Sequence, residues 1–168
     1  MNRRAFHRNE RGAAATEFAL ILPLMLILAF SIYEAGRVFW AYNIVQSSAR
    51  DASRYAARLG ITCTGSAATF NDSASTAAVQ NLARTGAIDG TGDPLLPGWT
   101  DNSTVTVALA CVSKTSGSTT FSGRYEGETS IPTVTVTAAA PYGLLFGGLF
   151  GGLTIDAVTV SNAQAWTE

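Results

Sequence analysis

An uncharged apolar stretch near the N-terminus limits the folds open to this chain more than any other feature. Residues 18–33 read FALILPLMLILAFSIY, and four small residues at 13–16 extend the stretch, with Glu17 as its single charge. About twenty helical residues, at roughly 1.5 Å each, cross the hydrocarbon core of a bilayer. We therefore expect a transmembrane helix. The alternative is a helix buried in a protein core, but little of the remaining chain could surround a helix that is apolar on all sides.

The basic residues around this stretch predict its orientation. Four arginines lie among residues 1–12, whereas Arg37 is the only basic residue in the fifteen positions after Tyr33. Because Lys and Arg favour the cytoplasmic side, we expect a cytoplasmic N-terminus and, in a bacterium, a periplasmic C-terminal domain. A secretory signal peptide is the competing interpretation. Its apolar run should be shorter and should end in a small-residue cleavage site, which is missing here.

The helix is expected to continue beyond the membrane. Residues 34–59 contain no proline, and apolar residues recur every three or four positions, as on one face of a helix. We predict one helix over residues 13–59, kinked at Pro23 and ended by Gly60. The predicted apolar face consists of Val38, Tyr42, Val45, Ala49, Ala52, Ala56 and Leu59.

A basic stripe follows the same helix. Arg50, Arg54 and Arg58 recur every four residues and share one side. A solvated face is the simplest interpretation. Contact with anionic lipid headgroups, or with acidic groups of a neighbouring subunit, is the alternative.

Residues 60–168 predict a small domain outside the membrane. Their alternating patterns indicate three or four strands, and one segment indicates a short helix that begins at Asp72 or Ser73 and ends at Gly86. The expected fold class is α+β: a long N-terminal transmembrane helix, then a small periplasmic domain with an antiparallel sheet and one short helix. The predicted elements are a loop over 61–71, the helix over 72–85, a loop over 86–102, and strands over 103–113, 133–139 and 154–161.

Two further features of this domain leave alternatives open. Cys63 and Cys111 both fall on the predicted periplasmic side, where disulfides persist, so we expect them to pair. Two unlinked buried thiols are the alternative. Residues 142–153, YGLLFGGLFGGL, are expected to form a loop or short helix whose Leu and Phe cover the sheet. The alternative is an exposed apolar patch that touches the bilayer surface or a partner protein.

Composition argues against several classes of function. The net charge is −1, so no basic excess exists to bind nucleic acid. His7 is the single histidine, and two cysteines cannot form a Cys-rich zinc site, so His-dependent catalysis and common metal sites lack ligands. Asp89, Asp93 and Asp101 form the only carboxylate cluster, and turns explain them better. We therefore expect no enzyme, no metal and no cofactor.

The residues at the membrane entry, RNERGAAATEFALILPLML, resemble the cleavage site of class III signal peptides. A prepilin peptidase processes that family after a glycine, the fifth residue of the mature chain is acidic, and an apolar helix follows. Gly12, Glu17 and Phe18 occupy these places, and Pro23 also fits. The resemblance implies a leader over residues 1–12 and a cut between Gly12 and Ala13.

The wider pattern is similar to TadE-type pseudopilins of the tight-adherence (Tad/Flp, type IVc) pilus. It combines this entry with the helix ending RYAARLG and with a C-terminal proline-tyrosine turn, glycine-rich stretch and last strand. The resemblance implies an inner-membrane, minor pilin-like subunit that supports pilus assembly, surface adherence and biofilm formation. Its implied partners are prepilin peptidase, other pilin or pseudopilin subunits and the assembly platform. The alternative is an unprocessed, single-pass, TadG-like anchor presenting a small β-rich binding module.

The sequence assigns a role in assembly to Glu17 and to the adjacent Phe18. An acid within a membrane segment is costly, which makes it a functional candidate by default. Cleavage would create an α-amine on Ala13, about one helical turn away. The resemblance implies that Glu17 pairs with such an amine, often on a neighbouring subunit. Solvation at the level of the headgroups is the alternative.

Overall fold

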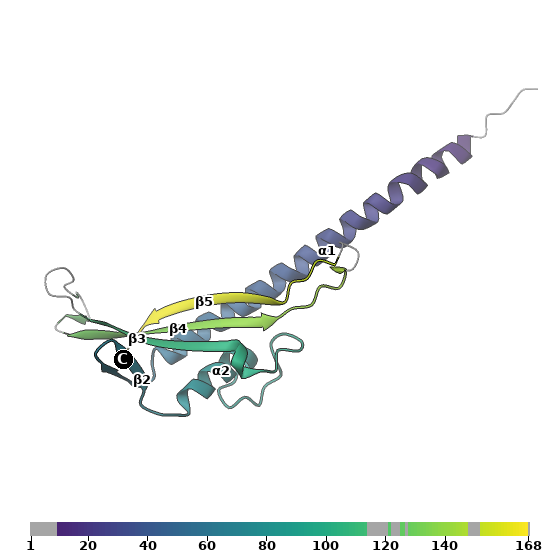
Figure 1. Ribbon diagram of the computed structural model, residues 1–168. Helices are drawn as coiled ribbons and strands as arrows, with labels where there is room; N and C mark the ends of the chain where they lie inside the picture. Colours follow the sequence, from purple (N-terminus) through teal and green to yellow (C-terminus); the bar gives the residue numbers. More distant parts are fainter. Residues whose placement is uncertain (1–9, 114–120, 122–124, 127, 148–151, 168) are drawn as a thin grey trace, which may run out of the picture.

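The computed structural model describes residues 10–113, 121, 125–126, 128–147 and 152–167. A long helix projects from a five-stranded antiparallel sheet, and a second, short helix packs against both the long helix and the sheet (Figure 1). The architecture confirms the predicted α+β class.

The long helix α1 spans Glu10–Ala56, and its N-terminal part stands free of the sheet (Figure 1). Large apolar side chains are exposed all along that part, and Leu20 reaches 81%. Within the described ranges, α1 is the one helix long and apolar enough to cross a membrane. None of its membrane-length window is buried, so within the described residues this part of α1 is not a core helix. Exposing this surface to water costs about 25 cal/mol per Å², which is consistent with a helix that could span a membrane.

The C-terminal half of α1 packs against the sheet. Val45, Ala49, Ala52 and Ala56 are fully buried, as the sequence pattern predicted. Tyr42 was expected on this face but is 41% exposed, and Ala41 is buried instead. Around the helix axis Tyr42 lies about 60° from Val45 and Ala41 only about 40°. The small Ala41 side chain also lets the helix approach the sheet more closely.

The end of α1 differs from the prediction by three residues. The helix ends at Ala56. The Ala57 N–H still bonds four residues back, to Ser53, and the following two N–H groups bond only three residues back, Arg58 to Tyr55 and Leu59 to Ala56. Such bonds tighten the last turn of a helix. Gly60 does not cap the helix. Its carbonyl accepts the N–H of Asn71 at 2.9 Å and opens a hairpin.

Residues 61–71, which the sequence indicated as a loop, form that hairpin. Strand β1 (Ile61–Thr64) pairs antiparallel with β2 (Ala67–Phe70) through a tight turn. Gly65 supplies the positive φ of 65° that such a turn requires. Small Thr and Ala residues made the segment resemble a loop, but Thr favours strands when a neighbouring strand is present.

The other predicted elements are present with shifted ends. Helix α2 spans Ser75–Thr85 and ends at Gly86 in the left-handed conformation, as expected. Neither Asp72 nor Ser73 is its N-cap, although the Asp72 carboxylate accepts the N–H of Ala74. A 3-10 turn, η1 (Asn102–Thr104), precedes the sheet strands. These are β3 (Val105–Ser113), β4 (Ser130–Pro141) and β5 (Ala157–Ala165).

The sheet has the order β1-β2-β3-β4-β5, and both helices cover one face of it (Figure 1). On β4 the buried residues Val134, Val136 and Ala138 alternate with half-buried threonines. The core therefore lies between the sheet and the helices, with Trp99 fully buried in it. The C-terminal part of α1 belongs to this core, from Ala41 to Ala56, and anchors the helix to the sheet.

Candidate functional site

Gly12 and Ala13, the residues that flank the predicted cleavage bond, lie in the first turns of α1. No described atom would come within 4 Å of a Cβ placed on Gly12, and the Thr16 hydroxyl donates to the Gly12 carbonyl at 3.3 Å. Residues 1–9 of the predicted leader lie outside the described residues. A glycine weakens a helix by about 1 kcal/mol relative to alanine, which favours local opening at this bond. Cleavage itself stays a prediction.

Glu17 and Phe18 are both exposed on α1. Glu17 follows Ala13 by four residues, so the two share one face of the helix. Within the part of the chain that the structure describes, no cation or hydrogen-bond donor reaches the Glu17 carboxylate. The structure thus brings Glu17 near Ala13 but gives its charge no partner among these residues.

Pro23 lies inside α1, and the helix continues through it. Proline has no N–H for the preceding turn and crowds the carbonyl four residues back. The site is therefore a weak point in an unbroken helix, and the kink stays a prediction.

A buried carboxylate that the sequence analysis missed lies where α1 meets the body, the part of the molecule formed by the sheet and α2. Glu34 is only 6% exposed. Its Oε1 accepts the Tyr142 hydroxyl at 3.0 Å and Arg37 Nη1 at 3.2 Å, while Oε2 accepts the Leu145 N–H at 3.2 Å. The Arg37 guanidinium also lies over the Tyr142 ring, 5.4 Å from its centroid. We call Glu34, Arg37, Tyr142 and Leu145 the Glu34 cluster.

The Glu34 cluster fixes the loop after β4 against α1. Burial, together with the hydrogen bond to Glu34, raises the pKa of Tyr142 above its ordinary value, so the phenol is retained as a donor. Phe146 adds an apolar contact, because its ring stacks on Phe30 with centroids 4.6 Å apart. The described part of segment 142–153 thus lies against α1 past the end of the sheet, which contradicts the expectation that it covers the sheet. Residues 148–151 lie outside the described residues.

The sequence carried a weak signal for Glu34. Glu34 directly follows the apolar run, where a charged residue is expected simply because a membrane segment ends there. Its partner Tyr142 is 108 positions away, and only the sheet, by returning the chain through β4, brings the two together.

We expect Glu34→Ala to lower the free energy of unfolding by about 2–3 kcal/mol, because three part-buried donors, on Tyr142, Arg37 and Leu145, lose a charged acceptor. Denaturant unfolding of the full-length protein in detergent, followed by tryptophan fluorescence, measures the change. Amide hydrogen exchange at Leu145 should also accelerate. Glu34→Gln keeps an acceptor oxygen and should lose less. Asp51→Ala, an exposed acid on the same helix, is the matched control, and an equal loss there would contradict the assignment.

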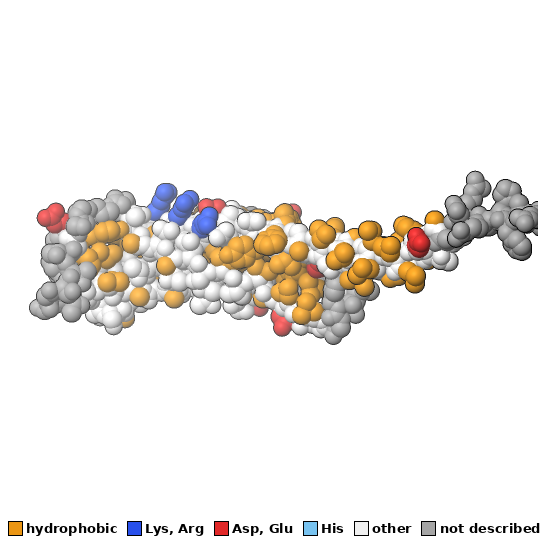
Figure 2. Space-filling view, turned by 90° about the horizontal axis from the view of Figure 1, so that it is seen from above, with side chains coloured by type: hydrophobic (Ala, Val, Ile, Leu, Met, Phe, Trp, Pro, Cys, Tyr) orange, Lys and Arg blue, Asp and Glu red, His pale blue; other side chains and the backbone are white. Residues whose placement is uncertain are grey.

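The basic stripe is exposed along α1 and beyond its end. Arg50, Arg54 and Arg58 are all exposed, and none forms an ion pair with a described acidic residue. Figure 2 shows Lys and Arg side chains in a row on the body, away from the projecting helix. Arg50 lies about 25 Å beyond Tyr33 along α1. That distance excludes contact with the headgroups of the membrane that α1 would span.

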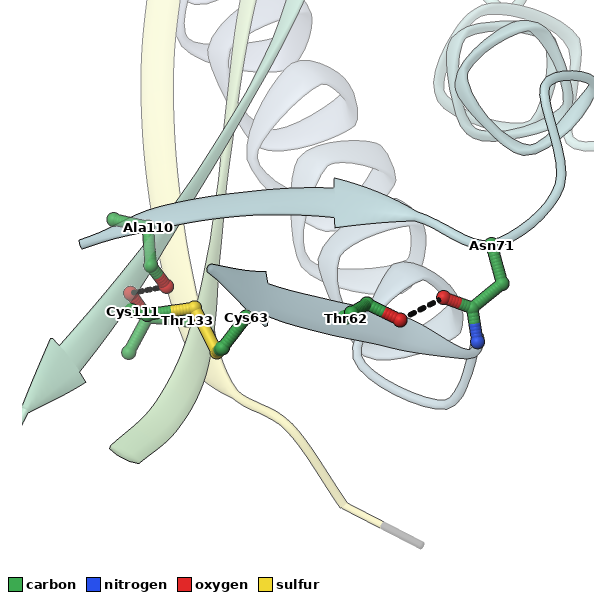
Figure 3. The surroundings of a disulfide bond; sticks show 6 residues. All are labelled: Thr62, Cys63, Asn71, Ala110, Cys111 and Thr133. Carbon is green, nitrogen blue, oxygen red and sulfur yellow. Dashed lines mark hydrogen bonds between the residues drawn. A yellow bond between two sulfur atoms is a disulfide. The ribbon is translucent and has the colours of Figure 1, made fainter. Parts of the chain in front are cut away.

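Cys63 and Cys111 form the predicted disulfide, with Cα atoms 5.9 Å apart (Figure 3). The bond joins β1 to β3 across the end of β2. Few backbone contacts connect the β1–β2 hairpin to β3. Strand β2 pairs with β3 only at Ala67 and Ala110, and the Cys111 N–H donates to the Ser66 carbonyl. The disulfide therefore holds the β1–β2 hairpin to the rest of the sheet.

Two members of the candidate carboxylate cluster, Asp89 and Asp101, are used in turns, and the third, Asp93, is exposed. The Asp89 carboxylate accepts the N–H and hydroxyl of Thr91, and Asp101 likewise accepts those of Ser103. The Thr91 N–H bond holds the pKa of Asp89 below its ordinary value, and the Ser103 hydroxyl does the same for Asp101. Among the described residues, no three His, Cys, Asp or Glu side chains gather in a way that could hold a metal ion.

Comparison with known proteins gives one family. Residues 12–54 match the family model described as TadE-like protein. Comparison with curated proteins and with solved structures gave no significant match. The matched segment begins at Gly12 and includes Glu17, Phe18, Pro23 and Glu34. The resemblance inferred from the sequence is thus confirmed over the helix: residues 12–54 are similar to the TadE-like family, which suggests association with the Tad pilus, and residues 55–168 lie outside the match.

Proposed function

We propose that this protein is a minor pilin-like subunit, a TadE-type pseudopilin, that assists assembly of a Tad/Flp type IVc pilus and so supports surface adherence and biofilm formation. One observation carries the proposal. The family match begins at Gly12 and runs through the membrane segment and the extended helix to residue 54. Its first residue is the one after which a prepilin peptidase would cut.

The proposed location is the bacterial inner membrane, with the N-terminus in the cytoplasm and the sheet in the periplasm. The exposed apolar half of α1 supports a membrane anchor. The arginines before it support the orientation, and the disulfide suits an oxidising compartment. The proposed partners are prepilin peptidase, other pilin or pseudopilin subunits and the assembly platform.

In this function Glu17 provides a contact between subunits. Its carboxylate is exposed on an apolar helix and has no partner in the described part of the chain. Cleavage after Gly12 would leave a positively charged amine on Ala13, which is the compact cation that a carboxylate in an apolar phase requires. The amine of a neighbouring subunit, or that of the same chain, would fill this role.

We expect Glu17→Ala to reach the membrane and to be cleaved, because Gly12 remains, yet to reduce piliation and surface attachment. Removing one partner of a buried ion pair costs about 3 kcal/mol or more, about a hundredfold in an association constant. Electron microscopy of surface pili and an attachment assay measure the loss. Asp51→Ala removes an acid from the aqueous part of α1 and should leave both unchanged. Normal piliation of a Glu17→Ala strain would refute the pairing role.

The alternative is an unprocessed, single-pass, TadG-like anchor that presents the sheet as a binding module. The continuity of α1 from Glu10 across the predicted cleavage bond is compatible with such an anchor. The intact mass of the protein purified from membranes separates the two functions. Loss of residues 1–12 supports the pseudopilin, and retention in a strain with an active prepilin peptidase supports the anchor.

A further inference from the structure

The loop after β4 carries exposed apolar side chains beside the projecting helix. Leu145 and Leu153 are 61% and 58% exposed. Figure 2 shows hydrophobic side chains that continue from the projecting part of α1 onto the adjoining part of the body. These exposed side chains do not pack on the sheet. We therefore look for a contact surface outside the folded domain.

The contacts of Phe146 fix the position of this loop along α1. Its ring stacks on Phe30 and meets Tyr33 edge-on, with the latter centroids 6.2 Å apart. Residues 13–33 rise about 30 Å as a helix, which is the thickness of the hydrocarbon core. Phe30 lies three residues inside the end of that span. The Phe146 ring is therefore level with the last turn of the membrane segment.

The polar groups at this level are arranged as at a membrane surface. The N–H of Leu145 donates to Glu34, so the loop enters the apolar region with this group satisfied, as a bilayer requires. Beyond Glu34 along α1 follow Arg37 and the exposed Trp40. Aromatic and cationic side chains of this kind are typical of the boundary between hydrocarbon and water.

We propose that Leu145, Phe146 and Leu153 insert into the periplasmic leaflet of the inner membrane as a second membrane contact of the domain. The inference rests on the proposed function in that α1 must span the membrane. Lipid is the favoured neighbour because the patch is level with, and continuous with, a helix surface that itself requires lipid. In addition, residues 143–155 carry no charge. Two membrane contacts, α1 and the loop, would set the tilt of the sheet above the bilayer.

The experiment measures the membrane depth of single labelled positions in the full-length protein. Leu145→Cys and Leu153→Cys are each labelled with an environment-sensitive fluorophore while the native disulfide stays oxidised. The proteins are reconstituted into phosphatidylcholine and phosphatidylglycerol vesicles, with or without lipids that carry a quenching nitroxide. Val112→Cys is the matched control, because Val112 is 48% exposed at the opposite end of the sheet. Leu24→Cys reports whether α1 spans the bilayer, and non-reducing electrophoresis confirms the Cys63–Cys111 bond in every variant.

We expect nitroxide near the headgroups to reduce the fluorescence of the labels at positions 145 and 153, but not of the label at 112. Nitroxide deep in the acyl chains should quench the label at position 24. Quenching at 24 with none at 145 and 153 would overturn the inference while leaving the membrane anchor intact. An absence of quenching at 24 would overturn both. If the labels at 145 and 153 escape the lipid quencher and are also shielded from aqueous iodide, a protein covers the loop and the lipid proposal is wrong.

Discussion

Replacing Gly12 by leucine should leave the whole precursor uncut in cells that contain an active prepilin peptidase. The enzyme is expected to require the smallest residue before the cleaved bond, because the backbone there must approach the catalytic groups closely. The structure separates this effect from misfolding, since no described atom lies within 4 Å of a Cβ at this position. Mass spectrometry of the protein from membranes should show residues 1–12 retained in Gly12→Leu and missing from the unmodified protein.

Gly36→Leu is the matched control for this prediction. Gly36 lies on the same helix, and there too a Cβ would meet nothing within 4 Å. The same substitution, placed after the membrane segment, should therefore leave processing unchanged. Normal cleavage of Gly12→Leu would refute the proposed site. So would an unmodified protein that keeps residues 1–12 beside an active peptidase, and that result would favour the TadG-like anchor.

Replacing both cysteines by alanine should lower the free energy of unfolding by about 4 kcal/mol. The bond closes a loop across 48 positions, and the chain-entropy model gives about that stabilisation for a loop of such length. The β1–β2 hairpin should be the first part to unfold, because it has a single paired position with β3. Denaturant unfolding followed by tryptophan fluorescence measures the midpoint, because Trp99 is buried and donates to the Thr104 hydroxyl at 2.8 Å.

Reductant provides the control for the cysteine variant. It should lower the unfolding midpoint of the unmodified protein to that of the Cys63→Ala, Cys111→Ala variant, and should leave the variant unchanged. Labelling of denatured protein should find free thiols only after reduction. Equal labelling with and without reductant, or equal midpoints of the two proteins, would show that the bond does not form in the cell.

Local patterns in the sequence determined the elements that depend on short-range chemistry. The apolar run predicted the projecting helix, because such a helix needs no tertiary partner to form in a bilayer. The alternation of Thr and Val predicted β3, β4 and β5, and Gly86 marked the end of α2. Gly12, Glu17 and Phe18 were identified by the resemblance of this local segment to the cleavage site of class III signal peptides, and the family match covers them.

Tertiary structure decided the features that depend on residues far apart in the chain. The β1–β2 hairpin lies in a segment rich in small residues, so its strands were not evident from local composition. The disulfide joins this hairpin to β3. Ala41 is buried and Tyr42 is exposed because the distance between helix and sheet, and not sequence spacing alone, decides which side chain is buried. Glu34 can be buried only because β4 brings Tyr142 and Leu145 to it. A buried carboxylate is stable only where the folded chain supplies hydrogen-bond donors. The same return of the chain placed Phe146 against Phe30, beside the end of the apolar segment.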